Sequence, residues 1–124
     1  MTKIKTHKEL KVFQLAFESA MAIFRLSKDF PKEETYSLTD QIRRSSRSVA
    51  ANLAETFRKR RYPKHFISKL TDCEAEAAET QVWLDFSFAC NYLSEEKHKQ
   101  LYDQYEHIIS MLVLMAAKPD NWSW

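Results

Sequence analysis

The sequence predicts an all-α protein, an antiparallel up-down-up-down four-helix bundle. The 124 residues include no glycine and only three prolines, whereas the tight turns of β-hairpins favour glycine. Apolar residues recur at three- and four-residue steps along four segments, as they do on one face of a helix. Only a few residues join these segments, so successive helices must be antiparallel neighbours. The length fits one domain, which we place at residues 1–124.

The first two helices are predicted over residues 7–29 and 34–60. The first ends before Phe30-Pro31, because the residue before a proline avoids the helical region. Glu33 and Glu34 suit the positive N-terminal end of the second helix. The apolar face of the first helix comprises Phe13, Ala16, Phe17, Ala20, Ile23 and Phe24, and that of the second comprises Leu38, Ile42, Val49, Leu53 and Phe57.

The third and fourth helices are predicted over residues 63–91 and 94–117. Pro63 suits the first turn of a helix, where its missing N–H is no loss, and Ser94 is a favourable N-cap. Their apolar faces comprise Phe66, Leu70, Cys73, Ala77, Leu84 and Phe88, and then Leu101, Tyr105, Ile108, Leu112 and Met115. The short tail 119–124 carries two tryptophans, and we expect it to pack on the bundle or on a neighbour.

Several classes of function have no support in the sequence. The phosphate-binding loops and the serine-nucleophile turn require glycine, and the four histidines show no metal-ligand spacing. We therefore expect no enzyme, no metal and no cofactor. No apolar run approaches the ~20 residues that cross a bilayer, and no signal peptide is visible. We expect a cytoplasmic protein with no membrane partner.

The two cysteines fit a reducing compartment. Cys73 and Cys90 are 17 positions apart in one predicted helix, which separates them by about 25 Å at ~1.5 Å per residue. A disulfide requires α-carbons within roughly 7 Å. Both cysteines are therefore predicted to be core residues.

Positive charge is concentrated around the second helix. Residues 41–69 contain nine basic residues and a single acid, Glu55. Arginine suits bidentate pairing with phosphate or carboxylate, although these side chains could also form an ordinary solvated face. The candidate nucleic-acid ligands are Arg43, Arg44, Arg47, Arg58, Lys59, Arg60, Arg61, Tyr62 and Lys64.

A stripe of small residues lies among these arginines. At ~100° per residue, Ala50, Ala51 and Ala54 share a helix face with Arg43, Arg47 and Arg58; we call this the arginine–alanine stripe. It would let a neighbouring helix or a phosphate backbone approach closely. The third helix offers a complement, the acidic stripe, made of Asp72, Glu76, Glu79 and Trp83. Both stripes are candidate surfaces for a subunit interface.

Three segments resemble one protein family. They are residues 30–34 (FPKEE), 38–45 (LTDQIRRS) and 48–55 (SVAANLAE). Together they resemble the 23S rRNA intervening-sequence protein family over about residues 8–117. The resemblance implies a four-helix bundle that assembles as a homopentamer, similar to the accessory variability protein of diversity-generating retroelements, which binds nucleic acid and reverse transcriptase. The chain departs from the family pattern at Ala50, Thr56, Ala75 and Glu76.

The sequence therefore leads to two alternative functions. The first is a non-enzymatic, oligomeric bundle whose basic helix-two surface binds RNA or single-stranded DNA. The alternative is a structural assembly or protein-binding adaptor with no affinity for nucleic acid, in which the arginines serve the subunit interface.

Overall fold

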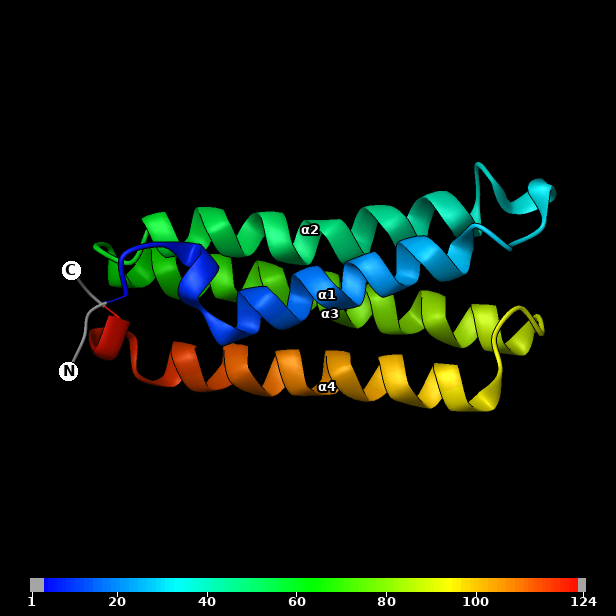
Figure 1. The fold of residues 1–124 in the computed structure, drawn as a ribbon. Helices are drawn as coiled ribbons and strands as arrows, with labels where there is room; N and C mark the ends of the chain where they lie inside the picture. Colours follow the sequence, from blue (N-terminus) through cyan, green and yellow to red (C-terminus); the bar gives the residue numbers. More distant parts are fainter. Residues whose placement is uncertain (1–3, 123–124) are drawn as a thin grey trace.

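Four long helices pack side by side in the computed structural model, which describes residues 4–122. They are α1 (Lys11–Ser27), α2 (Leu38–Arg58), α3 (Pro63–Ala89) and α4 (Glu95–Ala117), and successive helices run in opposite directions (Figure 1). No strand occurs in the described part of the chain. The predicted all-α four-helix bundle is confirmed.

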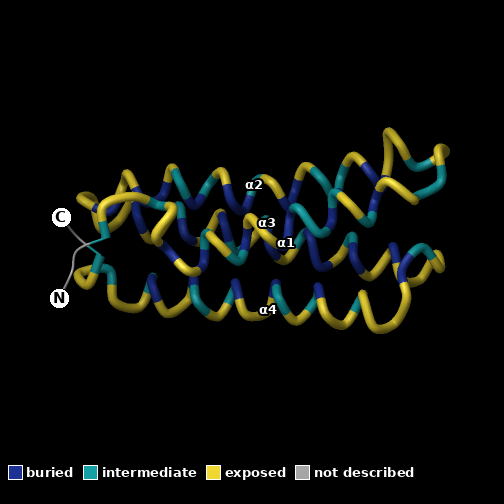
Figure 2. Tube along the Cα trace, in the orientation of Figure 1, coloured by how far each residue is buried: buried dark blue, intermediate teal, exposed yellow. Residues whose placement is uncertain are grey.

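The core lies on the inward faces of all four helices, as the burial colours show (Figure 2). Leu53, Leu70, Leu84 and Leu112 are fully buried, as their positions in the apolar stripes predict. Three predicted core residues are wrong: Phe17 and Phe88 are 54% and 39% exposed, and Cys90 is an exposed free thiol. Phe17 lies at the edge of its predicted stripe, Phe88 lies in the last turn of α3, and Cys90 follows the end of that helix, where periodicity alone does not decide burial.

The first helix starts later than the sequence predicts. Thr6 and Glu9 form a capping box around a separate 3-10 turn, His7–Glu9, and the extended conformation of Leu10 then interrupts the helix. α1 therefore begins at Lys11 and ends at Ser27, instead of spanning 7–29. The capping box therefore closes a single turn and does not start the long helix.

α2 also starts later, at Leu38 instead of residue 34. Residues Lys32–Glu34 form a 3-10 turn, and the backbone leaves the helical region at Ser37. Glu34 still caps α2, because its carboxylate accepts a hydrogen bond from the backbone N–H of Leu38 (3.3 Å) and another from the Tyr92 hydroxyl (3.0 Å). At the other end α2 stops at Arg58, two residues before the predicted end.

The joint between α3 and α4 closes without glycine. Asn91 takes the left-handed conformation (φ 65°) that glycine usually supplies after a helix. The backbone N–H groups of Asn91 and Tyr92 donate to the carbonyls of Phe88 (2.9 Å) and Ser87 (2.8 Å), which completes a Schellman motif. Ser94 then caps α4 as predicted, accepting from the N–H of Lys97 at 3.1 Å.

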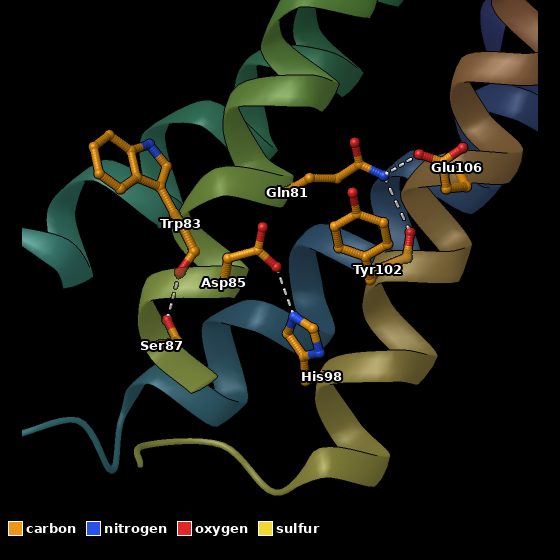
Figure 3. Close-up of polar contacts among 7 residues, drawn as sticks. All are labelled: Gln81, Trp83, Asp85, Ser87, His98, Tyr102 and Glu106. Carbon is orange, nitrogen blue, oxygen red and sulfur yellow. Dashed lines mark hydrogen bonds and ion pairs between the residues drawn. The ribbon is translucent and has the colours of Figure 1, made fainter. Parts of the chain in front are cut away.

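Polar contacts tie neighbouring helices together. Ser19 of α1 donates to Gln104 of α4 (2.8 Å), and Thr80 of α3 donates to Ser45 of α2 (2.8 Å). Figure 3 shows the α3–α4 side, where Gln81 donates to Glu106 (2.9 Å) and His98 pairs with Asp85 (2.8 Å). These contacts fix how the helices lie against each other.

The C-terminal tail packs on the bundle as far as the structure describes it. Residues Pro119–Trp122 form a 3-10 turn that contacts α3 and α4, and Trp122 packs against the core. The prediction for this tail is confirmed for Trp122, while Ser123 and Trp124 lie outside the described residues.

Candidate nucleic-acid interface

The turn between α2 and α3 presents most of the predicted cluster to solvent. α2 ends at Arg58, Lys59 caps it, and Pro63 opens α3. This turn is closed by a hydrogen bond from the N–H of Tyr62 to the carbonyl of Lys59 (2.9 Å). Tyr62 is 54% exposed, with its ring 6.1 Å from that of His65. The exposed basic residues of the turn are Arg58, Lys59, Arg61 and Lys64.

Arg60 differs from its neighbours. It is only 8% exposed, its guanidinium lies 3.7 Å from the centroid of the Phe57 ring, and it donates to the Phe57 carbonyl at 2.9 Å. Burial, and next the charge of Arg58, lower the pKa of Arg60. The guanidinium therefore caps the C-terminal end of α2 and is not presented as a ligand, which corrects the prediction made for this residue.

The topology brings further bases to this end of the bundle. The 3-10 turn His7–Glu9 and the C-terminal end of α4 lie at the same end of the bundle as the α2–α3 turn (Figure 1), and His7–Glu9 contacts α2. Lys5, Lys8 and Lys11 precede or open α1, and Lys118 follows α4; all four are exposed. We define the basic pole as Lys5, Lys8, Lys11, Arg58, Lys59, Arg61, Lys64 and Lys118.

Acids are fewer at this end. Glu9, Glu55 and Asp120 are the acids in these segments, and Glu55 lies 3.5 Å from Lys69. Hydrogen bonds from the backbone of Thr6 and Lys5 hold the pKa of Glu9 below its ordinary value. The four lysines could not be grouped from the sequence pattern, because they are scattered along the chain. The predicted up-down topology was the signal that could have placed them together.

Farther along α2, two arginines turn toward α1. The guanidinium carbons of Arg43 and Arg47 lie 4.9 and 5.5 Å from the centroid of the Phe24 ring, and the amine of Lys28 lies 4.8 Å from it. We call these four residues the Phe24 cluster. Nε of Arg43 also donates to the Ser27 hydroxyl at 2.7 Å, so this arginine is held by α1 of its own chain.

The alanines follow the same face of α2. Ala50 is buried in the core, Ala54 is half-buried, and Ala51 is exposed. Ala50 and Ala54 continue the spacing of Arg43 and Arg47 and therefore lie toward α1. Close helix packing at this stripe is thus used within the chain, and its role between subunits stays a prediction.

Arg44 lies on the other side of α2, toward the acidic stripe of α3. Burial, followed by the charge of Glu79, raises the pKa of Glu76, and the positive charge of Arg44 opposes this rise. Glu79 accepts a hydrogen bond from the indole N–H of Trp83 at 3.0 Å. Asp72, the first residue of the stripe, is exposed and also raises the pKa of Glu76. Arg44 is thus an arginine of α2 whose charge reaches the acidic stripe, although it is not a member of the arginine–alanine stripe.

Next to the acidic stripe, α3 exposes apolar side chains. Val82 and Phe86 are 48% and 52% exposed, and the Phe86 ring lies 5.8 Å from that of Trp83. Sequence periodicity gave no reason to single out Val82 or Phe86.

Residues 4–122 contain no group of three or more side chains placed to hold a metal ion. Within the same range, none of the helices combines the length and apolarity needed to cross a bilayer.

Comparison with known proteins identifies the family. No curated protein matches the chain. A crystal structure from Bacteroides thetaiotaomicron, of a protein of unknown function from the S23 ribosomal protein family, is 26% identical; the match covers 86% of this chain and 95% of that one, with a TM-score of 0.76. The model of the 23S rRNA-intervening sequence protein family matches residues 8–114. The chain therefore belongs to the 23S rRNA-intervening sequence protein family.

Proposed function

We propose that the protein is a non-enzymatic, cytoplasmic, oligomeric bundle that binds RNA or single-stranded DNA through its basic pole. One observation carries the proposal: exposed bases from three separate segments meet at one end of the bundle, where acids are few. Such a surface attracts a phosphate backbone because binding releases the counterions of the nucleic acid. Macrodipole stabilisation, about 0.3–1 kcal/mol per helix-end charge, accounts for one or two of these bases but not for all.

The comparisons leave the partner open. The name of the family refers to an intervening sequence of 23S rRNA, and the matching crystal structure is of a protein of unknown function. A likeness to the accessory variability protein of diversity-generating retroelements, which the sequence suggested, would support nucleic acid as the ligand and belongs to the proposal. The charge distribution remains its main support.

Reversing charge at the pole is expected to abolish RNA binding. The variant replaces Lys59, Arg61 and Lys64 with Glu and keeps Arg60, whose stacking on Phe57 supports the end of α2. In the unmodified protein, fluorescence anisotropy with labelled RNA should show affinity falling with salt, with a slope of about 0.7 per phosphate contact for single strands.

A matched control carries the same charge change elsewhere. Arg25, Lys32 and Lys97 are exposed and lie outside the pole, so their reversal to Glu should leave most of the affinity. Absence of RNA binding by the unmodified protein at about 50 mM salt, where electrostatic binding is strong, would contradict the proposal and favour the adaptor. Equal loss in both variants would show that only net charge matters.

Self-assembly is the second part of the proposal, a homopentamer by the resemblance. The acidic stripe and the exposed Val82 and Phe86 beside it form a surface of α3 that could bind another subunit. Light scattering of the unmodified protein should give a mass several times 14.7 kDa, and replacing Val82 and Phe86 with Glu should reduce it. A 14.7 kDa particle at micromolar concentration would contradict assembly.

A further inference from the structure

An aromatic row runs along the outer edge of α1 where it meets α2. Phe13, Phe17 and Phe24 follow at steps of four and seven residues, so they share one helix face. The rings of Phe13 and Phe17 lie 6.1 Å apart with an interplanar angle of 37°. The contact of Phe24 with Arg43 and Arg47 shows that this face turns toward α2.

Phe17 is the exposed member of the row. It is 54% exposed, although it occupies a position of the predicted apolar face. Phe17 precedes Phe24 by seven residues, about two turns of α1. Because α1 and α2 are antiparallel and Phe24 lies beside Arg43 and Arg47, this spacing places Phe17 level with the Ala50–Ala54 part of α2. Alanine side chains are short, so they do not cover the Phe17 ring and leave its face accessible to solvent.

Cations border this aromatic segment at both ends. Lys28, Arg43 and Arg47 converge on the Phe24 ring, and none of the three forms an ion pair with a carboxylate within the described residues 4–122. At the other end lies the basic pole. Acids are few on this face: Glu18 lies on a different side of α1, and Glu55 pairs with Lys69 of α3. Asp40, in the first turn of α2, is the acid of these two helices that lies on the face, one turn before Arg43.

The α1–α2 face is long enough to hold a short single strand of nucleic acid. Arg43 and Arg58 are 15 positions apart on α2, which corresponds to about 22 Å at ~1.5 Å per residue. Folds that bind single strands combine a cationic path with exposed aromatic rings, and their sites begin at about four nucleotides. A duplex keeps its bases stacked inside and offers no free base to a ring.

We propose that the α1–α2 face between the Phe24 cluster and the basic pole binds single-stranded nucleic acid, with a base stacked on Phe17 and phosphates at Lys28, Arg43 and Arg47. This inference rests on the proposed function and names its substrate class: single strands over duplexes. The basic pole supplies affinity for any phosphate backbone, and Phe17 supplies the preference for unpaired bases.

The test compares Phe17→Ala with the unmodified protein on two probes, a labelled oligouridine of about eight nucleotides, close to the lower site sizes of such folds, and an RNA duplex of equal length. Loss of one base–ring stack should weaken binding of the single strand by about 5- to 150-fold, and duplex binding should stay unchanged. Phe17→Trp should restore single-strand affinity, because it restores a stacking surface.

Two controls separate stacking from other effects. Tyr36→Ala removes an aromatic ring that is 93% exposed outside the face and should change neither affinity. The salt slope of Phe17→Ala should equal that of the unmodified protein, whereas Arg47→Gln should lower it by about 0.7, the value of one phosphate contact.

The outcomes distinguish the proposed function from the single-strand inference. If Phe17→Ala binds the single strand as well as the unmodified protein does, while the pole reversal abolishes binding, the inference is overturned and the proposed function stands. Equal weakening on both probes also overturns the inference. If Phe17→Ala lowers the mass measured by light scattering, the face is an interface between copies of the chain and the inference is wrong. Absence of any binding by the unmodified protein overturns both statements.

Discussion

Replacing Leu70 with Ala is expected to lower the free energy of unfolding by about 2–5 kcal/mol. Leu70 is fully buried on the face of α3 that packs against the other helices. The substitution removes buried methyl groups and leaves a cavity, because a close-packed core relaxes only in part. Urea denaturation followed by circular dichroism measures the change.

Leu114 provides the matched control. It is the same residue type in a helix, but it is 69% exposed on α4. Leu114→Ala should change the free energy of unfolding by no more than about 0.5 kcal/mol. A loss below about 1 kcal/mol for Leu70→Ala, under the range for buried leucines, would contradict the packing described for α3.

Alkaline pH is expected to destabilise the protein through Cys73. Burial raises the pKa of this thiol from 9.0 to about 11, although a contact with the Thr56 hydroxyl (3.6 Å) opposes the rise. Between pH 9 and 11 the unfolded chain loses a thiol proton that the folded chain keeps. The free energy of unfolding should therefore fall as the pH rises through this window, by about 3 kcal/mol in all.

The measurement compares unfolding free energies of the unmodified protein and Cys73→Ala from pH 8 to pH 11. Their difference should shrink or change sign as the pH rises, whereas a difference that stays constant would contradict the raised pKa. Burial also raises the pKa of Tyr105, but this contribution is common to both proteins and cancels.

In the folded protein a thiol reagent should modify Cys90, which is exposed, and leave Cys73 unmodified.

Much of the fold could be predicted because its signals are local. The apolar spacing identified four helices, and Pro63 and Ser94 marked the starts of α3 and α4 correctly. Ser45 and Ser46 donate to the carbonyls of Ile42 (3.4 Å) and Arg43 (3.1 Å) in the preceding turn, a local bond that serine can form inside a helix. Each of these features depends on residues within one or two turns of each other.

The starts of α1 and α2 were predicted too early for a related reason. Thr6 with Glu9, and Glu33 with Glu34, are good helix-start signals. Thr6 and Glu9 do form a capping box, but it caps a single 3-10 turn, and of the second pair it is Glu34 that accepts from the N–H of Leu38, from outside α2. The residue types near a helix start indicate which side chain can cap. The path of the backbone decides which turn that side chain caps.

By itself, the sequence determined the helices, the leucine core and the concentration of bases around α2. Only the tertiary structure decided which neighbour each helix face meets. It divided the arginines of α2 between α1 and α3, buried Arg60 on Phe57 and left Phe17 exposed beside the alanines. It also gathered the terminal lysines with the α2–α3 turn. The physical reason is that helical periodicity fixes directions around one axis, whereas burial and charge clustering depend on how several axes pack together.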